Sequence, residues 1–224
     1  MSLLSNIFKE LDFKVDEVPL HENNDKEVNI VTLPVVHHDD QEPVNVIWPN
    51  ATRGPWIAGG ACLRWYQGLP VGENDIDIFC NSHQQAIKVV ENIKSWGRYS
   101  TKHESDNAIT LSYYSKGDYT KNWTLQVIKR RYFNSLQEVV DSFDISVCQI
   151  GTTGEQWLLG NNTAKDIREK NLRMNAPLQP DAAKRLIKYW TYGYRPVEGL
   201  LDDIRNNPEA NKTFQVDGDY ENAF

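Results

Sequence analysis

The chain has 224 residues, 40% of them hydrophobic and 25% charged, which fits a folded globular protein and excludes a chain that is disordered throughout. No apolar run approaches the roughly 18 residues of a membrane span, and Lys9, Glu10 and Asp12 do not fit a secretory signal peptide. The formal net charge of −7 disfavours extensive DNA binding, because proteins that wrap polyanions carry a positive surplus. Three cysteines without a C-x-x-C pair indicate a reducing, cytoplasmic compartment.

Residues 1–50 have the weakest pattern and are expected to form an N-terminal extension. Within them, residues 29–36 are rich in Val, Ile and Thr and predict a strand. The run from His37 to Asp40 contains two histidines and two aspartates. A metal cluster would draw its ligands from separate elements, so a surface turn is the favoured interpretation.

Residues 51–160 have a clearer pattern and predict the core domain. The predicted strands are residues 56–58, 75–80, 108–114, 123–128 and 144–150. The predicted helices are residues 61–67, 82–96 and 136–143. Ser135 should cap the last helix, with Glu138 as its capping-box partner.

Residues 161–224 predict a mostly helical C-terminal region, with helices at 163–174 and 180–194. The acidic tail at 216–224 has no core-forming pattern, and an assembly partner could hold it in place. The predicted fold class is therefore α/β (α+β): a small mixed sheet flanked by helices, followed by a helical region.

Two consecutive glycines, Gly59 and Gly60, separate the predicted strand at 56–58 from the helix at 61–67. Free N–H groups and the helix dipole favour a phosphate at such a point. A glycine has no Cβ to keep a triphosphate away from the backbone. The glycine pair therefore predicts contacts to the phosphates of a nucleotide.

Asp75 and Asp77 follow the glycines and belong to one predicted strand. Residues i and i+2 of a strand point to the same face, so the two carboxylates should lie side by side. Neighbouring carboxylates repel each other unless a divalent cation lies between them, and oxygen ligands suit Mg²⁺ or Mn²⁺. Asp144 begins the predicted strand at 144–150 and becomes a third metal ligand if that strand lies next to the first.

Each feature alone has a plainer explanation. A Gly-Gly pair is usually a turn, an alternating Asp-x-Asp strand is usually a half-exposed edge, and an aspartate often begins a strand. Their order along the chain favours a functional site, because strand, glycine pair, helix, Asp-x-Asp strand, helix, hairpin, helix and Asp strand occur in one sequence.

The run Gly59-Gly60-Ala61-Cys62-Leu63-Arg64, then Gly68, then Asp75-Ile76-Asp77-Ile78-Phe79 resembles the polymerase-β-type nucleotidyltransferases. It is similar to the variant found in tRNA CCA-adding enzymes and poly(A) polymerases. Residues 143–149 and 185–194 resemble elements of small, phage-encoded nucleotidyltransferases. Arg64 stands one residue further from Gly60 than in the CCA-type pattern, and Trp65 stands where that pattern has an acid.

The resemblance implies a two-metal, in-line transfer of a nucleoside monophosphate from an NTP to an acceptor hydroxyl of RNA, a protein or a small molecule. Asp75 and Asp77 would bind two Mg²⁺ ions, and Asp144 would bind the catalytic one. Gly59 and Gly60 would hold the β- and γ-phosphates, with Arg64 as a further nucleotide ligand. A phage-encoded enzyme of this kind would work in the host cytoplasm or the virion.

The predicted helix at 180–194 carries Arg185, Lys188, Tyr189 and Tyr192 on one face. The cations could bind phosphates, and Tyr189 could stack on a base. Alternatively the tyrosines pack in the core and the cations are solvated; this is favoured for Tyr192, while both interpretations stay open for Lys188. The basic groups at 129–131 and 165–173 are expected to be solvated faces.

Two other functions compete with an active nucleotidyltransferase. The first keeps the fold without the chemistry, as a virion or assembly protein or a regulatory nucleotide binder. The second is a sugar-nucleotide glycosyltransferase, in which an Asp-x-Asp pair also binds a metal. It ranks last, because that class has a longer nucleotide-binding region before the acids than the 74 residues that precede Asp75 here.

Overall fold

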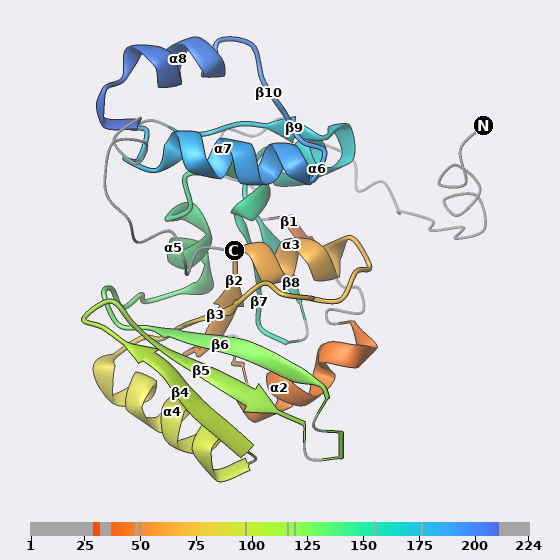
Figure 1. The fold of residues 1–224 in the computed structure, drawn as a ribbon, viewed down its shortest axis with the longest axis vertical. Helices are drawn as coiled ribbons and strands as arrows, with labels where there is room; N and C mark the ends of the chain where they lie inside the picture. The colour runs from red at the N-terminus through yellow and green to blue at the C-terminus, as the bar shows by residue number, and fades with distance from the viewer. Residues whose placement is uncertain are drawn as a thin grey trace, which may run out of the picture.

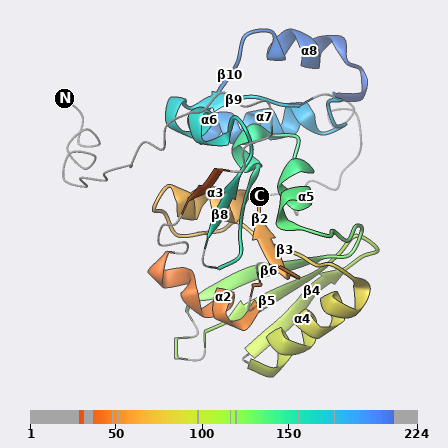
Figure 2. The same ribbon diagram turned by 180° about the vertical axis from the view of Figure 1, so that it is seen from behind.

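The computed structural model describes residues 29–31, 37–47, 49–50, 52–96, 98–115, 117–118, 120–154, 156–175 and 177–210. A mixed β-sheet with helices on both faces forms the core, and a mostly helical C-terminal region lies across one end of it (Figures 1 and 2). The predicted fold class is confirmed. The acidic tail and its assembly partner lie outside the described residues. No helix in the described ranges is long and apolar enough to cross a membrane.

Among the described residues, the main sheet has eight strands in the order β1-β8-β7-β2-β3-β6-β5-β4. All neighbours are antiparallel except β3 and β6, which are parallel. A parallel pair needs a crossover, which α4 and the β4–β5 hairpin supply. The strands are β1 (Asn29–Val31), β2 (Trp56–Ala58), β3 (Ile76–Phe79), β4 (Arg98–Glu104), β5 (Ala108–Tyr114), β6 (Asn122–Ile128), β7 (Ile150–Thr152) and β8 (Trp157–Leu159).

Helices cover both faces of this sheet. Helix α3 contacts β2, β3 and β7; α4 contacts β4, β6 and α2; and α5 contacts β2, β7 and β8. The helices of the core are η1 (His38–Asp40), α2 (Gln41–Ile47), α3 (Gly60–Tyr66), α4 (His83–Trp96), α5 (Leu136–Asp141) and η2 (Ser146–Cys148). The C-terminal region contains α6 (Thr163–Glu169), α7 (Ala182–Thr191) and α8 (Leu200–Asn206), with a small parallel pair of β9 (Asn171–Leu172) and β10 (Arg195–Pro196).

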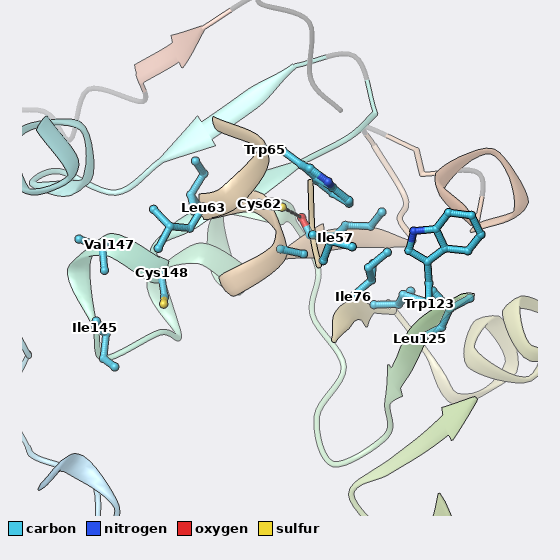
Figure 3. Packing of buried hydrophobic residues seen from close by; sticks show 14 of the residues in the cluster. Ile57, Cys62, Leu63, Trp65, Ile76, Trp123, Leu125, Ile145, Val147 and Cys148 are labelled. Carbon is cyan, nitrogen blue, oxygen red and sulfur yellow. Dashed lines mark hydrogen bonds between the residues drawn. The ribbon is translucent and has the colours of Figure 1, made fainter. Parts of the chain in front are cut away.

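Strand alternation divides the apolar side chains into two clusters. Ile57, Ile76 and Ile78 belong to the larger one, part of which Figure 3 shows with the side chains of α3 and η2. Trp56 and Phe79, on the opposite face, pack with the side chains of α5 in the smaller cluster. The short strands β2 and β3 are therefore buried on both sides, which fixes the backbone that carries Asp75 and Asp77.

Most predicted elements of the core are confirmed, among them the strands at 56–58 and 108–114 and the helix that begins at His83. Ser135 caps α5 by accepting a hydrogen bond from the Glu138 N–H at 3.2 Å. The Glu138 carboxylate accepts from the Asn134 N–H rather than from Ser135. The pattern missed β4, because its side chains from Tyr99 to Glu104 are exposed and show no apolar alternation.

The predicted strand at 144–150 is wrong. Ile145 makes a single bridge to Met174, residues 146–148 form η2, and β7 begins only at Ile150. The reason is tertiary: Ser146 donates its hydroxyl to Asp166 of α6 at 2.6 Å, and the Ser146 carbonyl accepts from Thr163 at 2.8 Å. These bonds to α6 replace the hydrogen bonds of a strand.

Both predicted C-terminal helices are shorter than expected. Helix α6 ends at Glu169 because Lys170 adopts a left-handed conformation with φ 58°, after which β9 pairs with β10. Helix α7 begins at Ala182, with Asp181 at its N-cap and Pro180 before it, and ends at Thr191.

Asp40 lies in the core and not on a surface turn, so the predicted turn at 37–40 is wrong for this residue. Only 2% of Asp40 is exposed. Its carboxylate accepts hydrogen bonds from the indole N–H groups of Trp65 and Trp123 and from the backbone N–H of Val71, at 2.7, 2.8 and 2.7 Å. One buried carboxylate thus joins η1, α3, β6 and the loop that leads to Asp75.

Replacing Asp40 with Ala should lower the free energy of unfolding by about 3–5 kcal/mol, because three buried N–H donors lose their acceptor. Asp39→Ala is the matched control: Asp39 is exposed and its ion pair with Lys121 spans 3.5 Å, so its loss should cost under about 1 kcal/mol. Urea unfolding of both variants measures the difference. Equal losses would contradict a special role for Asp40.

Candidate active site

The site is centred on the turn between β2 and α3. Gly59 follows β2 with φ +88° and donates its N–H to the Ile150 carbonyl at 2.8 Å. A Cβ on Gly59 would lie 2.9 Å from Phe143 Cε1, so this position has no room for a side chain. A Cβ on Gly60 would meet nothing within 4 Å. The first glycine is therefore required by packing, whereas the second leaves open space beside the backbone.

Asp75 and Asp77 lie next to this turn, because β2 and β3 are antiparallel neighbours. An ideal Cβ on Gly59 would lie 3.8 Å from Asp77 Oδ2. Burial and the neighbouring Asp75 carboxylate raise the pKa of Asp77 to about 7, although Lys188 opposes the shift. Burial also raises the pKa of Asp75, with Lys102 and Lys188 opposing. Within the described ranges, no hydrogen bond or ion pair to a protein group satisfies either carboxylate.

Asp144 has a different environment. It precedes η2 and accepts a bidentate pair of hydrogen bonds from the guanidinium of Arg185, both at 2.5 Å. Arg185 also forms an ion pair with Asp181 at 2.8 Å. Among the described residues, no three acidic, histidine or cysteine side chains are grouped closely enough to hold a metal ion. The structure therefore brings Asp75 and Asp77 together but pairs Asp144 with a cation.

Helix α7 supplies two of the cations near the site, Arg185 and Lys188. Lys188 follows Arg185 by one turn and favours the ionised forms of both Asp75 and Asp77. Sequence reasoning missed Lys102, which acts on Asp75 from β4 and donates a hydrogen bond to Thr124 at 2.9 Å. Lys102 lies where the register of β4 against β5 shifts, and only the strand pairing places it near Asp75.

Tyr189 packs in the core. It is 6% exposed, and its hydroxyl contacts the Cys148 thiol at 2.6 Å. Burial raises the pKa of Cys148 to about 12 and that of Tyr189 well above its ordinary value, so both groups stay neutral. Tyr192, which was expected to pack in the core, is 42% exposed. Tyr189 therefore anchors α7, and Tyr192 is the more accessible ring.

Arg64 supports the loop before Asp75. Its Nε donates to the Pro70 carbonyl at 2.6 Å, and its guanidinium lies 3.9 Å from an ideal Cβ on Gly72. A direct role for Arg64 in nucleotide binding stays a prediction.

The donor set of Asp75 and Asp77 fits a divalent cation that also binds phosphate. Mg²⁺ is commonly held by one or two carboxylates together with substrate phosphates and waters. Two oxygen donors held side by side, without protein hydrogen-bond donors among the described residues, match that chemistry. Asp144 can join them only if Arg185 releases it.

Comparison with known proteins adds the family and the fold. The model of the Gad2 family, "Gabija anti-defense 2 family protein", matches residues 26–170. The chain belongs to this family. A comparison with curated protein sequences found no match.

Solved structures of CCA-adding enzymes share the fold. A CCA-adding enzyme with CTP has a TM-score of 0.55 and 16% identity, covering 73% of this chain and 40% of its own. The Bacillus stearothermophilus CCA-adding enzyme with CTP has a TM-score of 0.52 and 16% identity, and the match covers 76% of this chain and 44% of the enzyme. The Thermotoga maritima CCA-adding enzyme with tRNA has a TM-score of 0.50 and 15% identity, and the match covers 67% of this chain and 37% of the enzyme. The Gad2 chain thus shares its fold with these enzymes and spans less than half of the length of each.

Asp77→Asn should stabilise the metal-free Gad2 protein at high pH. A raised pKa means that the folded state holds the proton more tightly, so stability falls as pH rises from about 4, where an unfolded aspartate titrates, to about 7. In EDTA at pH 8 the variant should melt at least about 2 °C higher than wild type, and at pH 4 the two should melt together.

Asp118→Asn serves as the control, because hydrogen bonds from Thr120 lower the pKa of exposed Asp118, the opposite direction. Its replacement should not raise the melting temperature at pH 8. An Asp77→Asn variant that melts at or below wild type at pH 8 would contradict the electrostatic account.

Proposed function

We propose that this Gad2 protein is a metal-dependent nucleotidyltransferase that moves a nucleoside monophosphate from an NTP to an acceptor hydroxyl. The observation that carries the proposal is the pair Asp75 and Asp77, held together beside the Gly59-Gly60 turn and facing Lys188. Two crowded carboxylates repel each other and cost stability, so a bound cation would account for their placement.

Each residue has a distinct part in the proposed chemistry. Asp75 and Asp77 would hold Mg²⁺ or Mn²⁺, which when bound neutralises phosphate charge and activates the acceptor oxygen. Lys188 carries positive charge toward the same space and would bind phosphate oxygens. The open space at Gly60 lets phosphate reach the backbone N–H groups, and Gly59 keeps the turn against Phe143.

The family description supports a biological role in countering Gabija defence. We propose that the transfer serves this role, that the protein is phage-encoded, and that it acts in the cytoplasm of the infected host or from the virion. The acceptor, whether RNA, a protein or a small molecule, would then belong to the host or to its defence.

A second candidate is a catalytically idle protein that keeps the fold to bind nucleotides or to act in the virion. The ion pair between Asp144 and Arg185 favours it, because the third carboxylate is engaged by a cation. The two candidates differ in one respect: an idle protein binds an NTP without forming a transfer product.

The test is a screen of the four NTPs, labelled at the α-phosphate, with Mg²⁺ or Mn²⁺ against host RNA and protein extracts. Wild-type protein should label an acceptor, and Asp75→Asn with Asp77→Asn should reduce labelling at least about a hundredfold. The exposed hairpin residue Asp106 gives the control variant Asp106→Asn, which should label normally. Activity that survives the double substitution would exclude the proposal, and binding without labelling would favour the idle alternative.

Substitutions at the two glycines test two different roles, packing at Gly59 and phosphate binding at Gly60. Gly59→Ala should lower the free energy of unfolding by more than about 2 kcal/mol, because of its positive φ and the Phe143 contact. Gly60→Ala should fold normally or gain up to about 1 kcal/mol, since Ala is the better helix former. If phosphates bind there, the stable Gly60→Ala variant should still bind NTP more weakly than wild type. Unfolding curves and NTP titrations measure both, and unchanged NTP affinity would remove Gly60 from the site.

A further inference from the structure

We propose that Arg185 is an internal counterion of the site: it neutralises Asp144 until the phosphates of a nucleotide draw it away. This inference rests on the proposed function, since it assumes that the same carboxylates bind a metal. It predicts that nucleotide and metal bind cooperatively.

The ion pair between Arg185 and Asp144 has the geometry of a strong one. Both terminal nitrogens of Arg185 bind Asp144, whose side chain is only 13% exposed, while that of Arg185 is 26% exposed. A bidentate, sheltered pair is stronger than an exposed one. A metal ion that uses Asp144 must therefore first displace a guanidinium, which makes metal binding without nucleotide unfavourable.

Lys188 follows Arg185 by about one helical turn and adds a second positive charge near the site. It favours ionisation of both Asp75 and Asp77, and its ammonium makes no hydrogen bond or ion pair that satisfies it within the described ranges. Two cations of α7 thus lie near three carboxylates: Asp75 just before β3, Asp77 in β3, and Asp144 before η2. Without a metal these cations offset only part of the negative charge, because the pKa values of Asp75 and Asp77 are still raised.

Arg185 has bonding capacity left. Its buried Nε has no hydrogen-bond partner in the described part of the chain. A triphosphate offers oxygens to the whole guanidinium fork, and Arg185 would then leave Asp144 to a metal ion. By linkage, a nucleotide that frees the carboxylates raises metal affinity, and the metal raises nucleotide affinity by the same factor.

Helix α7 can stay in place while Arg185 moves. Tyr189 is held by Cys148, and Tyr194, just after the helix, accepts a hydrogen bond from Gln67 at 3.0 Å. Both contacts join α7 to the core independently of Arg185. Arg185 can therefore move from Asp144 to a phosphate by rotation of its side chain, without movement of the helix.

Calorimetry with Mn²⁺ tests the proposal. In the absence of nucleotide, Arg185→Met should bind Mn²⁺ at least about fivefold more tightly than wild type, the lower end of typical coupling factors. The α,β-methylene analogue of ATP should bind wild type at least about fivefold more tightly with saturating Mn²⁺ than in EDTA, and Arg185→Met should show a smaller difference. The control Arg205→Met removes an arginine from an exposed ion pair on α8 and should match wild type.

A folded Arg185→Met variant with wild-type Mn²⁺ affinity would overturn the proposal. Adding Asp144→Asn to Arg185→Met should abolish the gain, and a gain that persists would also overturn it. If Arg185→Met does not fold, Arg185→Lys, which keeps the charge but loses the bidentate fork, should give a smaller gain, and no gain would count against the proposal. If wild type transfers nucleotide but its affinities for metal and nucleotide are independent of each other, this inference alone is overturned. If wild type binds neither Mn²⁺ nor the analogue, the proposed function is overturned as well.

Discussion

The site depends on the balance of charge between one helix and three carboxylates. Burial and the nearby Asp75 carboxylate raise the pKa of Asp77 to about 7, and Asp144 is neutralised by Arg185. Two of the cations near these acids, Arg185 and Lys188, come from α7, which is held in place by Tyr189 and Cys148, and Lys102 comes from β4. The C-terminal region is thus part of the site, because without α7 Asp144 would lose its counterion Arg185.

A second constraint fixes the backbone beneath the site. The buried Asp40 carboxylate binds Trp65, Trp123 and the N–H of Val71, and Val71 lies in the loop before Asp75. Trp65 is one of the positions where the sequence departs from the CCA-type pattern, and its indole N–H donates to the carboxylate of Asp40 in η1. The N-terminal segment therefore takes part in positioning the core of this Gad2 protein.

Much of the fold could be predicted because it follows local periodicity. β2, β5 and α4 have patterns of their own, with apolar residues at the spacing of a strand or helix. Elements whose conformation depends on distant partners were missed or wrong. β4 is exposed and shows no alternation, and residues 146–148 form η2 because Ser146 binds Thr163 and Asp166 of α6.

The same division applies to the site. The sequence alone determined that Asp75 and Asp77 share a face and that Gly59 and Gly60 lie at the end of β2, because two-residue spacing and strand order are local properties. Only the tertiary structure decided that Asp144 binds Arg185, 41 residues away, and that Tyr189 is buried while Tyr192 is exposed. Those outcomes depend on how α7 docks on η2, and the energies of such long-range contacts leave no periodic trace in the chain.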